Sequence, residues 1–425
     1  MNILLFNQDW FAEEFRSLGH HVVTAGTRAH MQVLTPVPGE TLAQVIERLP
    51  GGVRPDCVIV HDESAPLLIS GFEESPVPTI FYSVDAHHHI GVHRYTAHAF
   101  DAAFVAQRDY IPQFEAAGAS AAWMPLWASR HIEPSNDKRY GAVFVGSMNA
   151  ALNPERVAFF DRLQKAAPLL VTSGAFWQIF PYAEMVVNQT VKKDLNFRVF
   201  EAMMSGALLL TEDAENGLRD LFHPGRHLVT YKKGSVEEAA AQIAYYLDHK
   251  SEAREIACSG REEILRAHRP IHRAQFLLNV LDTLKPRKRH WRYYSVVPNF
   301  VWAANVLRKV SPALQARGLE IALRYVVKGL ASDPPPDEDL ACYLVAACLD
   351  FDHLLQASLG AKVLERVCEQ AAHIPLMHAA KMWMLMRRGE QSGAEKYARD
   401  YAATPVDQTL EQVRKIMGEL LSWSV

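Results

Sequence analysis

The sequence lacks several features that would quickly assign a chain to a class of proteins. No apolar stretch in its 425 residues reaches the roughly 20 residues that a transmembrane helix needs. The formal net charge of -4 provides no general basic field, so nucleic acid is not an expected partner. The first residues, Met1 to Asp9, lack a basic leader and a long apolar core, and are more typical of a first strand than of a signal peptide. We therefore expect a soluble, cytoplasmic protein.

Common nucleotide and catalytic motifs are missing as well. There is no Walker loop, no G-x-G-x-x-G and no nucleophile elbow, so nucleotide hydrolysis, a standard dinucleotide site and α/β-hydrolase chemistry lack support. The cysteines show no paired spacing for zinc or redox chemistry, and we expect structural thiols and no bound metal. These cysteines are Cys57, Cys258, Cys342, Cys348 and Cys368.

Two series of short apolar runs alternate with helical patterns. The first series lies at residues 2–6, 21–25, 57–60, 79–83 and 102–106, and the second at 141–147, 169–172, 185–188, 207–211 and 227–230. Such alternation is typical of doubly wound parallel sheets. The predicted fold class is α/β, with a Rossmann-like domain over residues 1–134 and a second over residues 135–284. Two such domains in tandem enclose a cleft at the carboxyl ends of their strands, where open α/β sheets bind ligands.

The third part, residues 285–425, has a helical pattern without a strand signal. It begins with the basic run Lys285 to Arg292, which is a solvated linker or a contact for a membrane surface or an acidic partner. Gly360-Ala-Lys and Gly393-Ala-Glu recur 33 positions apart, and residues 387–390 form a turn between two helices. Both tetratricopeptide-like hairpins and an irregular helical bundle fit this pattern.

The segment between Asn188 and Glu212 is the most informative part of the chain. Asn196 is a favourable N-cap residue, residues 197–205 contain strong helix formers, and Gly206 supplies a left-handed stop before an apolar run of strand length. The predicted order is loop, helix and buried strand.

Arg198 and Glu201 lie three residues apart on this predicted helix, between two apolar faces. The helix N-terminus favours an anion such as a pyrophosphate. An ordinary surface ion pair is the alternative. However, the helix is apolar at six of its nine positions, which is not typical of a solvated helix. We therefore interpret it as a holder of phosphate and ribose groups.

A second polar group follows the predicted strand at residues 79–83, where Asp85 precedes His87, His88 and His89. An Asp and a His two apart on an extended segment share a face, so Asp85 could orient His87 and raise its basicity for acid–base catalysis. A metal site and a hydrogen-bonded structural loop are the alternatives. Three adjacent His side chains cannot all bind one ion.

Gly146 and Ser147 follow the first strand of the second domain, where a small residue lets a phosphate or a base approach the backbone. Together with the segments above, they resemble the CgeB-like and group 1 glycosyltransferases of the GT-B fold, over roughly residues 1 to 283. The matching segments are residues 144–147, Asn188, 196–212, 221–225, 229–231, 256–260 and His268, with a looser match at 85–87 and 100–107.

This resemblance implies a hexosyltransferase-type enzyme that transfers a sugar from a nucleoside diphosphate sugar without a metal. The donor-binding residues would be Gly146, Ser147, Asn188, Lys192, Asn196, Arg198 and Glu201. Glu201 would bind the ribose hydroxyls, and Arg198 would stabilise the departing diphosphate. Asp85 and His87 would face the donor from the first domain as base or electrostatic support.

The resemblance leaves several points open. Many retaining relatives have a second Glu eight positions before Glu201, where this chain has Lys193, so both retention and inversion of configuration stay open. UDP, GDP and other bases are all compatible. The acceptor is a protein, such as a flagellar or surface protein bound by the helical part, or a polysaccharide or small molecule. A sugar-nucleotide epimerase and a non-catalytic nucleotide- or partner-binding scaffold are the rival functions.

Overall fold

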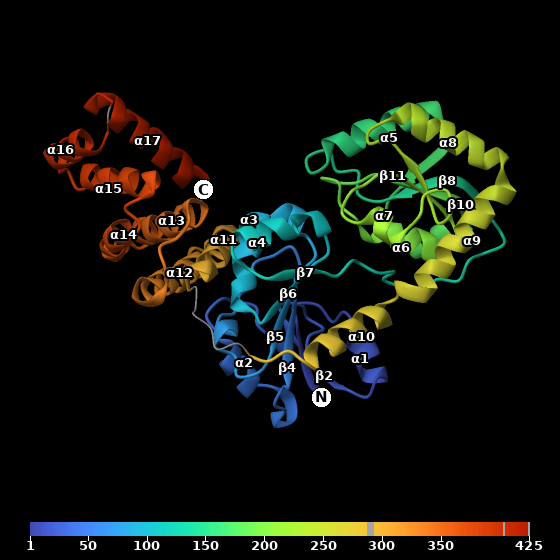
Figure 1. The fold of residues 1–425 in the computed structure, drawn as a ribbon, viewed down its shortest axis with the longest axis horizontal. Coiled ribbons are helices and arrows are strands. Elements are labelled where there is room, and N and C mark those ends of the chain that lie inside the picture. Colours follow the sequence, from blue (N-terminus) through green and yellow to red (C-terminus); the bar gives the residue numbers. More distant parts are fainter. Residues whose placement is uncertain (287–292, 403, 424–425) are drawn as a thin grey trace.

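The structure is a computed structural model that describes residues 1–286, 293–402 and 404–423, arranged in three parts (Figure 1). Residues 287–292 of the predicted basic linker lie outside the described residues. Among the described helices, none combines the length and the apolar character that crossing a bilayer requires.

The first part is a parallel sheet with the strand order β3-β2-β1-β4-β5-β6-β7. Its strands are β1 (Asn2–Phe6), β2 (His21–Gly26), β3 (Val33–Leu34), β4 (Cys57–His61), β5 (Thr79–Ser83), β6 (Ala102–Val105) and β7 (Ala121–Trp123). Its helices are α1 (Ala12–Ser17), α2 (Leu42–Glu47), α3 (Ala86–Thr96) and α4 (Ile111–Ala116). The central strands β4 and β5 are buried along their whole length, as expected for strands covered on both faces.

The second part is a smaller parallel sheet with the order β12-β11-β10-β8-β9. Its strands are β8 (Tyr140–Val145), β9 (Leu169–Thr172), β10 (Ala183–Asn188), β11 (Leu208–Glu212) and β12 (Val229–Tyr231). Its helices are α5 (Pro154–Ala166), α6 (Phe197–Met204), α7 (Leu218–Leu221), α8 (Val236–Asp248) and α9 (Lys250–Ala267). The two sheets confirm the predicted α/β class, and ten of the strands lie where the apolar runs predicted them.

The chain crosses between the two sheets twice, and the crossings lie side by side. After α9 it returns to the first sheet as α10 (Pro270–Leu281), which packs against α1. The Arg273 guanidinium on α10 donates to the carbonyls of Pro125 and Leu126, both at 2.7 Å. The N–H of Ala128 donates to the carbonyl of His268 at 2.9 Å. These bonds join the two connections, residues 124–139 and 268–269, and we call the joined segments the hinge region.

The third part is helical, which confirms the predicted class of this region. Its helices are α11 (Val297–Leu307), α12 (Pro312–Ser332), α13 (Glu338–Leu355), α14 (Leu359–Gln370), α15 (Pro375–Arg387), α16 (Gln391–Tyr401) and α17 (Val406–Trp423). Consecutive helices pack against one another, and the predicted turn at residues 387–390 joins α15 to α16, with Gly389 at φ +75°. Gly360 and Gly393 both lie in the first turn of the second helix of a pair. The tetratricopeptide-like assignment stays a prediction.

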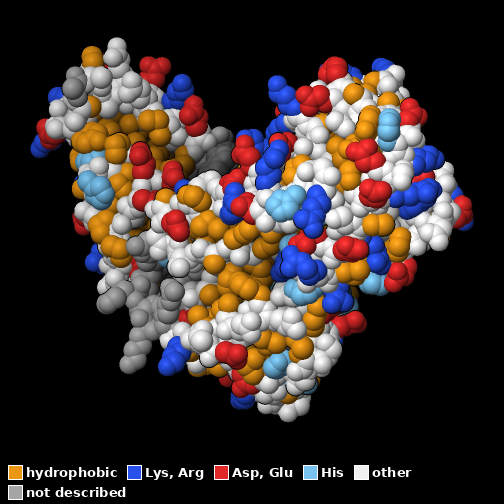
Figure 2. All heavy atoms as spheres, turned by 45° about the vertical axis from the view of Figure 1, so that its right-hand side comes forward, with side chains coloured by type: hydrophobic (Ala, Val, Ile, Leu, Met, Phe, Trp, Pro, Cys, Tyr) orange, Lys and Arg blue, Asp and Glu red, His pale blue; other side chains and the backbone are white. Residues whose placement is uncertain are grey.

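The helical region is continuous with the first domain. One hydrophobic core contains residues of the first sheet together with residues of α11 to α17. Arg94 and Tyr95 on α3 bind Asp339 and Asp337 at the start of α13, at 2.6 and 2.8 Å. These contacts fix the start of α13 against the last turn of α3. Figure 2 shows the surface indented between the helical region and the second domain.

Candidate functional site

The loops at the carboxyl ends of the two sheets contact one another. Lys192, which follows β10, donates from Nζ to the carbonyl of His87, which follows β5, at 3.2 Å. Gln107, which follows β6, accepts the N–H of Leu195 at 2.8 Å and donates to its carbonyl at 3.3 Å. Two predicted site residues from opposite domains, His87 and Lys192, are thereby brought together.

Helix α6 is covered on both sides, as its two apolar faces predict. Val199, Phe200 and Met203 are each at most 1% exposed. Gly206 ends the helix at φ +69°, a conformation that glycine adopts without a Cβ penalty. A helix buried in this way is not the solvated helix on which a surface ion pair would form.

Arg198 and Glu201 turn to different partners. Arg198 Nη1 donates to Asn188 Oδ1 at 2.7 Å, and Nε donates to the carbonyl of Val145 at 3.1 Å. Glu201 Oε1 accepts from Ser129 Oγ at 2.6 Å. The surface ion pair considered as the alternative is therefore wrong for this helix. Arg198 instead connects α6 to the carboxyl ends of β8 and β10.

Gly146 is required by the protein's own packing. A Cβ at this position would lie 2.5 Å from Arg198 Nη2 and 2.8 Å from the Phe144 ring. The Arg198 guanidinium lies over that ring, 4.6 Å from its centroid. The space that the glycine leaves open thus admits the guanidinium, which is a different reason from the direct approach of a ligand that the sequence suggested.

A second guanidinium, that of Arg156, lies over the ring that Arg198 covers. Arg156 on α5 is 8% exposed and lies over the same Phe144 ring, 5.7 Å from its centroid. It donates to Gln189 Oε1 at 3.0 Å and to the Gln189 carbonyl at 3.3 Å. Burial, and then repulsion from Arg156, lower the pKa of Arg198 to about 10, so both groups are cationic at neutral pH. Two cations held against one ring attract negative charge, such as that of a phosphate.

Buried carboxylates balance part of this charge. Burial raises the pKa of Asp194 to about 6, against the opposing effects of its bond from the Val191 N–H and of the nearby Arg156 and Arg198 charges. Burial also raises the pKa of Glu201, opposed by the Ser129 hydrogen bond and by the Arg198 charge. Glu201 lies next to the hinge region, where Arg130 stacks on Trp177, 4.4 Å from a ring centroid.

The remaining predicted residues of the second domain lie at the edge of this group. Asn196 precedes α6 as predicted, but its side chain makes no capping bond. Its Oδ1 is buried without a partner among the described residues. Ser147 is exposed, and its hydroxyl only accepts from the N–H of Asn149 at 3.4 Å.

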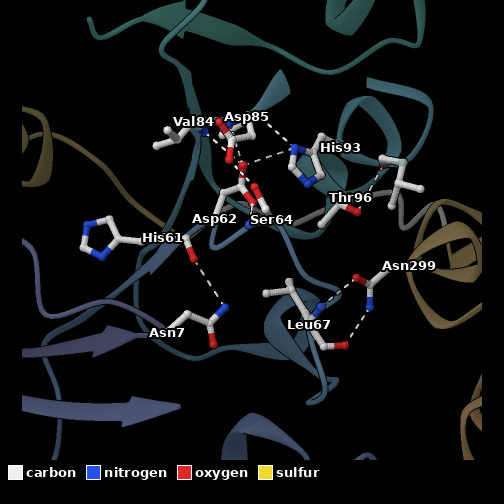
Figure 3. Close-up of polar contacts among 12 residues, drawn as sticks. Asn7, His61, Asp62, Ser64, Leu67, Val84, Asp85, His93, Thr96 and Asn299 are labelled. Atoms are coloured by element: carbon white, nitrogen blue, oxygen red, sulfur yellow. Dashed lines mark hydrogen bonds and ion pairs between the residues drawn. The ribbon is translucent and has the colours of Figure 1, made fainter. Parts of the chain in front are cut away.

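Asp85 and His87 do not lie on an extended segment, so that expectation is wrong. Helix α3 begins at Ala86, immediately after β5, and Asp85 is the residue before it. The carboxylate of Asp85 accepts from the hydroxyl of Ser64 (Figure 3). The carbonyl of Asp85 accepts the N–H of His88 at 2.9 Å, as in the first turn of a helix.

The imidazole of His87 is not made more basic. Burial, then the neighbouring His88, lower its pKa to about 4, which outweighs the opposing charge of Asp85. The imidazole is therefore neutral at physiological pH, and its Nδ1 is buried without a partner among the described residues. His87 is suited to a hydrogen bond with a ligand rather than to a stable positive charge.

The three adjacent His side chains do not converge. His89 stacks on Trp302 of α11 at 4.6 Å, while His87 and His88 lie against each other at 4.1 Å. In the described ranges, no group of three or more His, Cys, Asp or Glu side chains is arranged to hold a metal ion.

Sequence reasoning missed residues that other elements supply. Ser129 binds Glu201 and Asp62 binds Asp85 across large sequence separations. Arg156 lies over the same Phe144 ring as Arg198. Only Asp62 could have been found from the local sequence, because it follows a predicted strand in the same way as Asp85 does. Arg156 and Ser129 had no such signal.

Comparisons with known proteins agree with this architecture. Residues 112–279 match a family model described as "Glycosyl transferase-like". HepE of Anabaena in complex with UDP and glucose is similar, with a TM-score of 0.51 and 13% identity over 67% of this chain and 100% of that chain. HepE in complex with UDP-glucose has a TM-score of 0.51 and 12% identity, over 67% of this chain and 100% of that chain.

Sucrose-phosphate synthase from Thermosynechococcus elongatus has a TM-score of 0.46 and 12% identity over 66% of this chain and 99% of that chain. None of the curated proteins matched. The likeness to HepE shows the GT-B arrangement of the two Rossmann-like domains.

Proposed function

We propose that this chain is a glycosyltransferase that moves a sugar from a nucleoside diphosphate sugar on the second domain to an acceptor on the first. The match of residues 112–279 to a glycosyl transferase-like family supports this proposal. So does the shared fold with HepE, whose structures contain UDP with glucose and UDP-glucose. UDP is therefore the first nucleotide to test, with GDP and other diphosphates as the comparison set.

The observation that carries the proposal is the pair of guanidiniums, the buried Arg156 and the partly buried Arg198, at the carboxyl end of β8. Arg156 and Arg198 share the Phe144 ring, and Gly146 leaves room for the second of them. A departing nucleoside diphosphate gains negative charge, which fixed cations in a dry site stabilise strongly. Lys192 would add a third charge at the domain contact. In this proposal these cations neutralise the diphosphate without a metal.

Other predicted residues have roles consistent with this donor. Glu201, with one oxygen oriented by Ser129, would accept from the ribose hydroxyls. The unpaired Oδ1 of Asn196 and Nδ1 of His87 would each gain a partner when a polyhydroxyl ligand binds. Asp85 would act as base or electrostatic support for the attacking hydroxyl of the acceptor. We also propose that the helical region presents the acceptor, with a protein acceptor as the first to test.

A thermal-shift screen against nucleoside diphosphates and their sugar conjugates tests the donor site. A ligand present at about 100 times its Kd stabilises the native state by about 2.7 kcal/mol, which raises Tm by several degrees. We expect this shift with one nucleotide family, and its loss in Glu201→Ala. Glu255→Ala, at an exposed position on α9, is the matched control and should keep the shift. The donor-site proposal is wrong if no diphosphate raises Tm.

Product analysis separates the rival functions. A transferase releases free nucleoside diphosphate from the sugar nucleotide that gives the shift, whereas an epimerase converts it to a second sugar nucleotide without release. A shift without either product would favour a nucleotide-binding scaffold.

Gly146→Ala is a sharper probe of the same site. The new Cβ would displace the Arg198 guanidinium from Asn188 and Phe144. Loss of a charge-assisted contact of about 1.5–3 kcal/mol would weaken UDP binding about 10- to 100-fold, as measured by isothermal titration calorimetry. Gly418→Ala, on the exposed face of α17 with open space around it, is the control and should bind UDP like the unmodified protein. Equal binding by both variants would contradict the role of Arg198.

A further inference from the structure

The loop after β4 contains a buried carboxylate that the proposed function does not use. Asp62 is 3% exposed. Its Oδ2 accepts the backbone N–H groups of Val84 at 3.2 Å and of Asp85 at 2.8 Å, and its Oδ1 accepts the N–H of Ser64 at 2.8 Å (Figure 3). One carboxylate therefore ties the loop after β4 to the end of β5, where the candidate catalytic residue Asp85 lies.

Ser64 links the two carboxylates. Its φ is +56°, a left-handed conformation that a side chain with a Cβ rarely adopts. The bond from its N–H to Asp62 closes a turn of the type that Asp side chains stabilise. In this conformation the Ser64 hydroxyl donates to Asp85 Oδ2. The strained residue thus directs a donor to the Asp85 carboxylate.

Asp62 is ionised at neutral pH although its burial disfavours the charge. Burial, then the charge of Asp85, raise its pKa to about 6, so it is ionised at neutral pH and can accept all of its bonds. His93 lies behind it, with Nδ1 3.7 Å from Asp62 Oδ2 and 2.8 Å from Ser83 Oγ. Burial lowers the pKa of His93 to about 4, so this imidazole is neutral. The ionisable groups around Asp62 are Glu63, Tyr82, Asp85, His88, His89 and His93.

The helical region holds the same loop from the other side. Asn299 on α11 is 4% exposed; its Oδ1 accepts the N–H of Leu67 and its Nδ2 donates to the Leu67 carbonyl, both at 2.9 Å. Farther along, Lys328 on α12 binds Glu74 at 2.8 Å, and the Tyr325 hydroxyl donates to the buried Glu73. The segment from Asp62 to Glu74 is therefore held between the end of β5 and the first two helices of the helical region.

From this geometry we propose that Asp62 and Ser64 are positioning residues for Asp85, and that Asn299 of the helical region fixes the loop that presents Ser64 to it. The inference rests on the proposed function, because it assigns to that site the residues that orient its candidate base. It also gives the helical region a part in the reaction step, in addition to any contact with the acceptor.

The first test measures the rate of UDP release from the UDP-sugar that raises Tm. In Asp62→Asn, Ser64→Ala and Asn299→Ala, we expect kcat to fall about 10- to 100-fold, as for a reacting group displaced by about 1 Å. The KM for the donor should stay unchanged, because the nucleotide-binding groups belong to the second domain. Asn305→Ala, on the same helix as Asn299, is the matched control and should keep kcat.

The kcat of double variants distinguishes a positioning role from a general disturbance of the fold. In the background of Asp85→Asn, Ser64→Ala and Asp62→Asn should cause no further loss of kcat, because the group that they orient is already gone. Multiplicative losses in the double variants would overturn the proposal, as would a wild-type kcat in Ser64→Ala.

A substrate-free measurement keeps this inference testable if the proposed function fails. The Tm loss caused by Ser64→Ala should disappear in the background of Asp85→Ala, where the hydroxyl has no acceptor. The raised pKa of Asp62 means that its proton is held more tightly in the folded state, so its contribution to stability falls as pH rises from about 4 to about 6.

The Tm of Asp62→Asn relative to the unmodified protein should therefore rise over that pH window. A flat difference, together with additive Tm losses for Ser64→Ala and Asp85→Ala, would show that the loop geometry does not couple these groups. The absence of any UDP-induced shift would instead count against the donor site alone.

Discussion

Arg198→Met should reduce kcat/KM for the donor by about 10²- to 10³-fold, the range observed when one preorganised group that stabilises transition-state charge is removed. The substitution keeps a long apolar side chain over the Phe144 ring but removes the cation that the structure holds between Asn188 and Val145. The UDP-induced rise in Tm should be lost together with the rate. Both are measured on the same preparation, by UDP release and by thermal shift.

Two further variants make this result interpretable. Arg198→Lys keeps the charge but not the planar fork, and should give an intermediate rate and shift, because Lys cannot reproduce a two-point contact. Arg226→Met, at an exposed position on the same domain, should change neither. Arg198→Met leaves Asn188 Oδ1 without its donor, so its ligand-free Tm should fall as well. A normal UDP shift in Arg198→Met would remove this residue from the donor site.

The strands were predictable because their signal is local. Parallel strands covered on both faces appear as continuous apolar runs, and ten such runs correspond to strands in the structure. The two strands that were missed, β3 and β7, contain two and three residues at the edges of the first sheet. Segments that short contain no periodicity, and they form because an existing strand offers free backbone groups.

The candidate site was predictable where one segment contains both the sequence pattern of a helix and the polar residues of the site. Helix α6 was found because the Asn that precedes it, its two apolar faces and its glycine stop are all contiguous. The partner of Glu201 was not, because Ser129 lies in the hinge region. Arg156, which lies over the same ring as Arg198, comes from α5. Ser129 lies 72 residues from Glu201, and Gln189, the partner of Arg156, lies 33 residues from it. Only the fold makes such contacts visible.

The prediction about His87 failed for a physical reason that sequence spacing does not contain. An Asp two residues away does favour the charged imidazole, and the structure retains that effect. Its magnitude is smaller than the cost of burying the charged form of the imidazole. The predicted extended segment failed similarly, because α3 starts directly after β5 and rotates His87 toward Lys192.

The helical region is more than an appended module in this structure. It shares one hydrophobic core with the first sheet and contacts the segment that holds Asp85 in position. An acceptor bound on this region would therefore be fixed relative to the candidate base, whereas the donor would belong to the second domain. Within residues 1–286, the chain connects the two domains only through the hinge region. The hinge region would therefore set how the donor and the acceptor are placed relative to each other.

Asp85→Asn should lower kcat by about 10²- to 10⁴-fold, the range for loss of a general base, while leaving the UDP-induced shift in Tm unchanged. The reason is the separation of roles between the domains. Asp85 precedes α3 in the first domain, and the groups proposed to hold the diphosphate lie in the second. The amide is nearly isosteric and can still accept from Ser64, so the fold of the loop should persist. UDP release and thermal shift again provide the two readouts.

Asp248→Asn, at an exposed position on α8, controls for the loss of one negative charge and should retain full activity. The combination of outcomes decides whether Asp85 acts in the acceptor step or in binding of the donor. A lost rate with an intact shift assigns it to the acceptor step, because binding of the nucleotide does not then depend on it. Parallel loss of both would make Asp85 part of the donor site or of the domain contact at His87 and Lys192. A normal rate would leave the neutral His87, with its unpaired Nδ1, as the first-domain group to test next.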